Sequence, residues 1–316
     1  MARTHAARLP HVHLNRPDIG FAGAPIETDT DRIDADVAIL GVPFGWPYPR
    51  AGATAGCAVA PTAVRRRAAR LERFRDHWDF DTGAPMLPLV GGPRIVDAGD
   101  VPGDATDGAG NAALTTAAVT GVLARGAVPI CIGGDDSVQA PILRAFAGRG
   151  EVTVLHVDAH LDFRDEVDGV REGYSSPMRR ASEMAHVGRI VQVGLRGVGS
   201  ARAAELTDAR SAGNLLVTAR ELRERGVGWL LGQLPGGPVF VAFDCDALDP
   251  SVAAAVSAPA PGGLSWEEAS DLLGGIGPRL VGAAFTEFVP ALDHNELTAL
   301  AVSRLVVRLA GGVPAR

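Results

Sequence analysis

The chain has few cysteines, and their spacing indicates neither a disulfide framework nor a thiolate metal site. Cys57, Cys131 and Cys245 are the only three in 316 residues, and no Cys-x-x-Cys pattern occurs. An odd number of widely spaced cysteines is typical of reduced thiols in the cytosol. We therefore expect a cytoplasmic protein.

Long apolar runs and positive net charge are lacking as well. No run approaches the roughly 18 apolar residues of a membrane span. The N-terminal residues lack the apolar core of a signal peptide, so none is expected. The net charge of −7 argues against nucleic acid or an anionic membrane as partner and suits a cationic small molecule. Ordinary solubility is the simpler explanation of this charge.

The pattern that is present is an alternation of strands and helices. Nearly half of the residues, 47%, are apolar, which is enough for a large core. Helical patterns separate about eight expected strands, at 36–41, 94–97, 127–132, 152–157, 190–195, 215–217, 239–243 and up to 287. Alternation predicts a parallel sheet covered on both faces, and eight strands could also close into a barrel. Residues 35–316 read as one domain, preceded by an irregular arm or floppy tail over 1–34.

Two acid-rich motifs follow buried strands. Residues 152–157 run into Asp158, His160 and Asp162, and the motif at Asp244 and Asp246 repeats this arrangement. Parallel sheets place their ligand sites at the carboxyl ends of strands. A single aspartate there would read as a helix cap or turn former, but capping does not need this density. So many carboxylates would repel one another unless cations lay among them.

The residue types indicate which cations these are. Carboxylates with one or two imidazoles suit Mn(II) and similar divalent ions, whereas zinc prefers thiolate-rich sites. Two metals roughly 3.5–4 Å apart can activate a shared water near neutral pH. The sequence therefore predicts a binuclear metallohydrolase.

The motifs at 158–162 and 243–250 resemble the two metal signatures of the ureohydrolase family, which comprises arginases, agmatinases and guanidino-acid hydrolases. Segments 41–44, 257–264 and 285–290 are similar to further family motifs, so the resemblance covers most of the chain. It implies an open, single-domain, three-layer α/β/α fold instead of a barrel. It also implies two divalent ions, Mn(II) or else Ni(II), and a homo-oligomer, trimer or hexamer. The implied reaction releases urea from an agmatine-like amine or a guanidino acid.

The resemblance also assigns roles to residues. Asp158 and Asp244 would bridge both metals, His160 and Asp246 would complete one site, and Asp136 and Asp162 the other. Asp249 would fix the following loop, and Cys245 reads as core. Asp162, Glu287, whose counterpart contacts the guanidinium, and Tyr174 are the expected catalytic positions.

Two departures from the family bear on activity. Asp136 stands where relatives carry histidine, so five carboxylates face two divalent ions. This excess charge should raise the pKa of a metal-bound water and favour Mn, Mg or Ca, or the short side chain could leave one site empty. Tyr174 replaces a proposed proton-shuttle histidine, and a phenol is a poor shuttle at neutral pH. His156, inside an apolar strand, reads as a core residue more readily than as a substitute.

These departures keep two alternatives open. One is a catalytically impaired homologue that serves as a binding or oligomer-partner subunit, and the other is an amidine hydrolase with altered substrate or metal. Ala260 stands where the family often has glutamate, and Gly197 and Gly199 where arginases have aspartates, so arginine is a weak substrate candidate. The loop at 43–60 is expected to shape the substrate site. Arg65, Arg66 and Arg67 fan around a helix and are expected to be solvated or to lie at a subunit contact.

Overall fold

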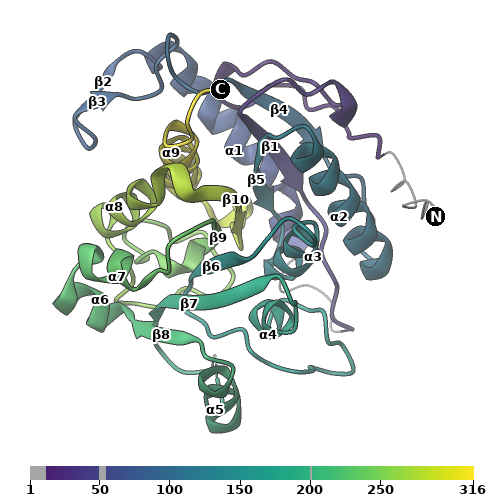
Figure 1. Cartoon of the computed structure of the whole chain (residues 1–316), viewed down its shortest axis with the longest axis vertical. Coiled ribbons are helices and arrows are strands. Elements are labelled where there is room, and N and C mark those ends of the chain that lie inside the picture. The colour runs from purple at the N-terminus through teal and green to yellow at the C-terminus, as the bar shows by residue number, and fades with distance from the viewer. Residues whose placement is uncertain (1–11, 50–54, 200) are drawn as a thin grey trace, which may run out of the picture.

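Eight parallel strands form one open sheet in the computed structural model, which describes residues 12–49, 55–199 and 201–316. The strand order is β4-β1-β5-β10-β9-β6-β7-β8, and helices flank both faces (Figure 1). The strands are β1 Val37–Val42, β4 Ile95–Asp100, β5 Val128–Gly133, β6 Val152–Val157, β7 Val187–Leu195, β8 Leu215–Thr218, β9 Val239–Asp244 and β10 Leu280–Thr286. The expected three-layer parallel fold is confirmed, and a barrel is excluded because β4 and β8 stand at opposite ends of the sheet and do not pair with each other.

Strand alternation divides the buried residues between two cores. In β1, Val37 and Ile39 pack into one core, while Ala38 and Leu40 pack into the other. Both faces are apolar because successive side chains point to opposite sides and helices cover each side. The central strands are therefore covered by helices on both faces.

The helices separate cleanly by face. The first core is covered by α1 Ala60–Ala68, α6 Ala219–Arg225, α7 Val227–Gln233, α8 Trp266–Ile276 and α9 Leu297–Gly311. The second core is covered by α2 Gly108–Ala124, α3 Gln139–Arg144, α4 Pro177–Ser182 and α5 Ala203–Ser211. Residues 219–233 form two helices, α6 and α7, and not one, because Gly226 adopts φ +82° between them. No helix of the described residues is long and apolar enough to cross a bilayer.

Two short features lay outside the sequence expectations. A hairpin of β2 Trp78–Asp79 and β3 Ala84–Pro85 projects from the body beside the C-terminal end of the chain (Figure 1). The described part of the arm, from residue 12, follows the β4 edge through bridges of Asn15 to Asp100 and of Ile26 to Asp97. The arm therefore covers a sheet edge that would otherwise be exposed.

Arg65 corrects the interpretation of the three adjacent arginines. Its side chain is 1% exposed, and it donates from Nε and Nη2 to the two oxygens of Asp97, at 2.8 and 3.0 Å. It also contacts Asp100 Oδ1 at 2.5 Å. Arg66 remains exposed. Helix phase alone selects which arginine enters the interior, where its charge must be paired.

We expect Arg65→Ala to lower the free energy of unfolding by about 3–5 kcal/mol, because it leaves the buried Asp97 carboxylate without a counter-charge. Urea denaturation followed by circular dichroism measures the change. Arg66→Ala is the matched control and should stay within about 0.5 kcal/mol of the wild type. Equal stability of the two variants would show that the buried ion pair contributes nothing.

Candidate metal centre

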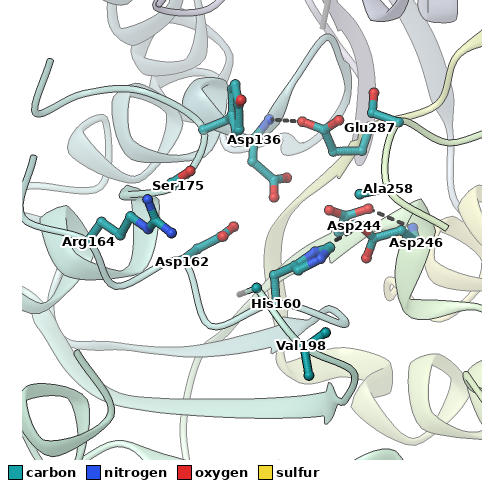
Figure 2. Close-up of a pocket in the computed structure, with 13 residues that line it drawn as sticks. Asp136, His160, Asp162, Arg164, Ser175, Val198, Asp244, Asp246, Ala258 and Glu287 are labelled. Carbon is teal, nitrogen blue, oxygen red and sulfur yellow. Dashed lines mark hydrogen bonds and ion pairs between the residues drawn. The ribbon is translucent and has the colours of Figure 1, made fainter. Parts of the chain in front are cut away.

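Four neighbouring strands bring the predicted site residues to one edge of the sheet. Asp136 follows β5, Asp158 follows β6, Asp244 ends β9, and Glu287 follows β10. Because all four strands are parallel, their carboxyl ends open on the same side. Acidic side chains there line a cavity of about 320 Å³ (Figure 2).

The acidic residues form two groups that share one aspartate. Asp136, His156, Asp158 and Asp162 each offer a ligand atom within 4.8 Å of the others, and so do Asp158, His160, Asp244 and Asp246. All six metal positions expected from the sequence therefore come together, and His156 joins them. Asp158 belongs to both groups, whereas Asp244 belongs to the second.

Asp136 is held firmly by its neighbours. Its Oδ1 accepts hydrogen bonds from Gln139 Nε2 and from Thr286 Oγ1. Its backbone N–H donates to Glu287 Oε1 at 3.0 Å. Both bonds are to one oxygen, so the other, Oδ2, is the atom that would serve as a metal ligand.

His160 faces the second group through Nδ1. This nitrogen lies 3.0 Å from Asp246 Oδ2 and 3.4 Å from Asp158 Oδ1. Burial acts to lower the pKa of His160, but the two carboxylates outweigh it and raise the pKa to about 11. The imidazole therefore occupies the place of a cation in this cluster, and a metal ion would displace its proton.

Crowding raises the pKa of several carboxyl groups. Burial, followed by the charge of Asp158, raises the pKa of Asp136 to about 6 and that of Asp246 to about 7. Burial and neighbouring carboxylates raise the pKa of Asp162 and Asp244 well above the ordinary range. Asp158 is the exception: burial alone would raise its pKa, but His156 and His160 lower it. Repulsion of this kind is relieved when cations bind.

The residues fit two divalent ions. Asp162 Oδ2 is buried and finds no hydrogen-bond donor among the described residues, which is costly unless a cation takes that place. The ligands are carboxylate oxygens with one or two imidazoles, a set that suits Mn(II).

His156 is a buried neighbour of Asp158. Its Nε2 lies 3.0 Å from Asp158 Oδ2, and its Nδ1 lies 3.1 Å from Gln192 Nε2. The Gln192 amide is oriented by the Leu161 carbonyl, which accepts from Nε2 at 2.7 Å, and by Asn214 Nδ2, which donates to Oε1 at 3.0 Å. Since Gln192 donates to Nδ1, the His156 proton lies on Nε2 and faces Asp158. In this tautomer His156 could ligate a metal only after Nε2 lost its proton. Neither Nε2 nor Asp158 Oδ2 has a hydrogen-bond partner among the described residues, so the two atoms are neighbours without a formed hydrogen bond.

Glu287 and Asp162 adopt left-handed backbone conformations, with φ of +63° and +49°. Such angles are unfavourable for residues other than glycine and often mark functional sites. Glu287 is buried at the cavity, with Oε1 bonded to the Asp136 N–H and Oε2 lying 3.9 Å from Cys57 Sγ. Burial, then the charges of Asp136 and Asp135, raises its pKa well above the ordinary range. A bound cation would keep it ionised.

Tyr174 lines the cavity, as expected. Its ring packs edge-on against Tyr48, with centroids 4.6 Å apart. Tyr48 Oη also accepts from the Ser175 N–H at 3.3 Å, so the loop after β1 contacts the cavity wall. Residues 50–54 of that loop lie outside the described part. Burial raises the pKa of Tyr174, so its hydroxyl is a hydrogen-bond donor at neutral pH.

Asp249 and Cys245 lie outside the metal ligands. Asp249 Oδ2 accepts from the N–H groups of Gly262 and Gly263, at 2.9 and 3.2 Å, and so fixes the loop after β9. Cys245 is fully buried among apolar residues. Cys57, Cys131 and Cys245 are all unpaired and buried.

Sequence reasoning missed the residues that hold the ligands in place. Gln139, Thr286 and Gln192 orient Asp136 and His156, and Arg164 lines the cavity. Short spacings were the available signal for two of them: Gln139 follows Asp136 by three residues, and Arg164 follows Asp162 by two. His156 shares a strand face with Asp158, two residues on, which was the available signal for its position.

Comparisons with known proteins agree with this geometry. Residues 35–311 match the arginase family. The human mitochondrial guanidino acid hydrolase is 30% identical over 300 residues, covering 92% of this chain and 81% of the relative. The agmatinase of Sodalis glossinidius is 30% identical over 301 residues, covering 92% and 91%. The solved proclavaminate amidino hydrolase of Streptomyces clavuligerus has a TM-score of 0.78 at 29% identity, covering 95% of this chain and 97% of that one.

Proposed function

Because the chain belongs to the arginase family, we propose that it hydrolyses the guanidino group of a small compound and releases urea. The observation that carries this proposal is the pair of carboxylate and imidazole groups that share Asp158 and open into one cavity with Glu287. Five carboxylates beside that cavity would be needless in a protein that only bound a partner.

Two divalent ions held by these residues would activate a water molecule as the nucleophile. Asp136 and Asp162 would hold one ion and His160 and Asp246 the other, and Asp158 and Asp244 would serve as further ligands. Mn(II) fits the oxygen-rich set, and Ni(II) is the second candidate.

Glu287 binds and orients the substrate in this proposal. Its Oε1 already accepts from the Asp136 N–H, and Oε2, which Cys57 Sγ approaches at 3.9 Å, would accept from a guanidinium N–H. Addition of water to the guanidinium carbon and cleavage of one C–N bond give urea and a protonated amine, with both protons of the attacking water ending on the leaving nitrogen. Tyr174 donates a hydrogen bond at the cavity wall, in place of a proton-shuttling histidine.

The relatives do not select the substrate tail, because their names include both an agmatinase and a guanidino acid hydrolase. We further propose a cytoplasmic homo-oligomer, a trimer or hexamer. The three cysteines, which form no disulfide and are buried, support the proposed cytoplasmic location.

We expect the protein loaded with Mn(II) to release urea from at least one member of a panel of ω-guanidino amines and acids. Colorimetric urea detection with parallel amine detection measures the reaction. Chelation should abolish it, and restored Mn(II) should recover it.

Two results would contradict the proposal. Absence of urea and of any other amide product, with two ions bound, would favour the binding-subunit alternative. Release of a different amide from an amidine compound would instead indicate an amidine hydrolase with an altered substrate.

A further inference from the structure

We propose that Arg164 selects substrates whose tail ends in a carboxylate, an inference that rests on the hydrolysis proposed above. Besides Glu287 and the residues of the two metal-ligand groups, Arg164 is the one charged side chain among the described residues that line the cavity. The negative charges are thus gathered where metals and guanidinium would bind, and the wall carries a positive charge.

Arg164 is placed where a substrate tail would pass. It lies two residues after Asp162, and its backbone N–H donates to the Ser175 carbonyl at 3.1 Å. This bond ties the two segments together, so that the Arg164 and Ser175 side chains occupy the same wall. Figure 2 shows both on the Asp162 side, across the cavity from Ala258, with the guanidinium turned toward the acidic residues.

The ion pair of Arg164 uses only part of its guanidinium, so N–H donors remain for a ligand. Arg164 forms this ion pair from Nε to Glu205 Oε1 at a long 3.7 Å. Glu205 also accepts from the Arg202 backbone N–H at 2.7 Å and from Arg202 Nη1 at 3.2 Å. The Glu205 carboxylate therefore pairs with both Arg164 and Arg202, which leaves a net positive charge on this group of three residues. The side chain is 22% exposed, so a ligand in the cavity can reach it.

A carboxylate matches this wall better than an amine. A guanidinium has five N–H donors in a planar fork, which pairs with both oxygens of a carboxylate. An ammonium tail would instead meet a like charge, and every carboxylate among the lining residues already serves the metals or the guanidinium. We therefore expect affinity to be highest for a substrate with a carboxylate tail, lower for one with a neutral tail and lowest for one with an amine tail.

Three compounds with the same guanidino end and similar length isolate the tail: 4-guanidinobutanoate, butylguanidine and agmatine. Calorimetry on the full-length, Mn(II)-loaded protein measures binding, and urea release measures turnover. The acid should bind at least about tenfold more tightly than butylguanidine, and agmatine more weakly than both.

Arg164→Gln should weaken the binding of 4-guanidinobutanoate by about 10- to 100-fold and should raise its KM more than it lowers its kcat. The binding of butylguanidine should change by less than about threefold. The neutral compound thereby controls for misfolding. Arg164→Lys should retain part of the preference because it keeps the charge but loses the fork. Arg202→Gln is the matched control: it removes the other partner of Glu205 outside the cavity lining and should preserve the order.

The outcomes separate this inference from the hydrolysis. Three results would overturn the role of Arg164 even if urea is released. They are equal affinities for the three compounds, no measurable binding of the acid, and an equal loss of affinity for all three compounds in Arg164→Gln. Preferential binding of the acid without urea would instead sustain the role of Arg164 and overturn the hydrolysis.

Discussion

Asp244→Asn is expected to reduce the bound metal from two ions per chain to one or none and to lower kcat by about 10³-fold or more. The reason is geometric and electrostatic: Asp244 lies in the group with Asp158, His160 and Asp246, and amides are poor ligands for such ions. Loss of metal removes several kcal/mol of barrier lowering, and each 1.4 kcal/mol is about tenfold in rate.

Elemental analysis of protein loaded with Mn(II) and then desalted gives the stoichiometry independently of any substrate. Asp271→Asn is the matched control, since Asp271 is exposed on α8; it should retain two ions and full activity. Two tightly held ions in Asp244→Asn would remove Asp244 from the site. One ion in the wild-type protein would indicate that Asp136 does not replace the family histidine.

Glu287→Gln is expected to lower kcat/KM for a guanidino substrate by about 10²- to 10³-fold while both metal ions remain bound. The substitution preserves shape but removes the charge that a guanidinium would meet, and hydrogen bonds between charged groups are the strong ones. Unchanged metal content distinguishes this variant from Asp244→Asn, because Glu287 lies outside both metal-ligand groups.

Steady-state urea release and metal analysis on the same preparation test this prediction. Glu267→Gln, an exposed change on α8, serves as the control. An unaltered kcat/KM would exclude Glu287 from substrate binding, and a loss of metal would show that it supports the metal ligands instead.

Strand runs were the part of the fold that the sequence predicted well. Five of the six residues over 152–157 are apolar or β-branched, with His156 the exception, and β6 has these bounds. Such a run is unambiguous because both faces of a parallel strand are buried. The hairpin at Trp78 is too short for any periodicity, and the helix break at Gly226 depends on one backbone angle.

The candidate site also has features that the sequence predicts and features that it does not. The metal positions follow from strand ends, because topology places the ends of parallel strands together. The support of His156 by Gln192 follows from register, since these residues are paired across β6 and β7. Register is a long-range property that one sequence does not display. Likewise, the phase of α1 turns Arg65 inward, but its partner Asp97 lies 32 residues away in the chain, and one sequence does not display that pairing.

The last strand of the chain lies in the middle of the sheet. β10 separates β4-β1-β5 from β9-β6-β7-β8, and it carries Glu287 at its end. During synthesis, two partial sheets can therefore form before the strand that joins them exists, and the Asp136 N–H awaits a partner 151 residues further along the chain. The catalytic cavity is complete only when the final strand inserts between β5 and β9. A nascent or truncated chain therefore carries the aspartates but lacks a closed site, and the capacity for hydrolysis arises at the end of folding.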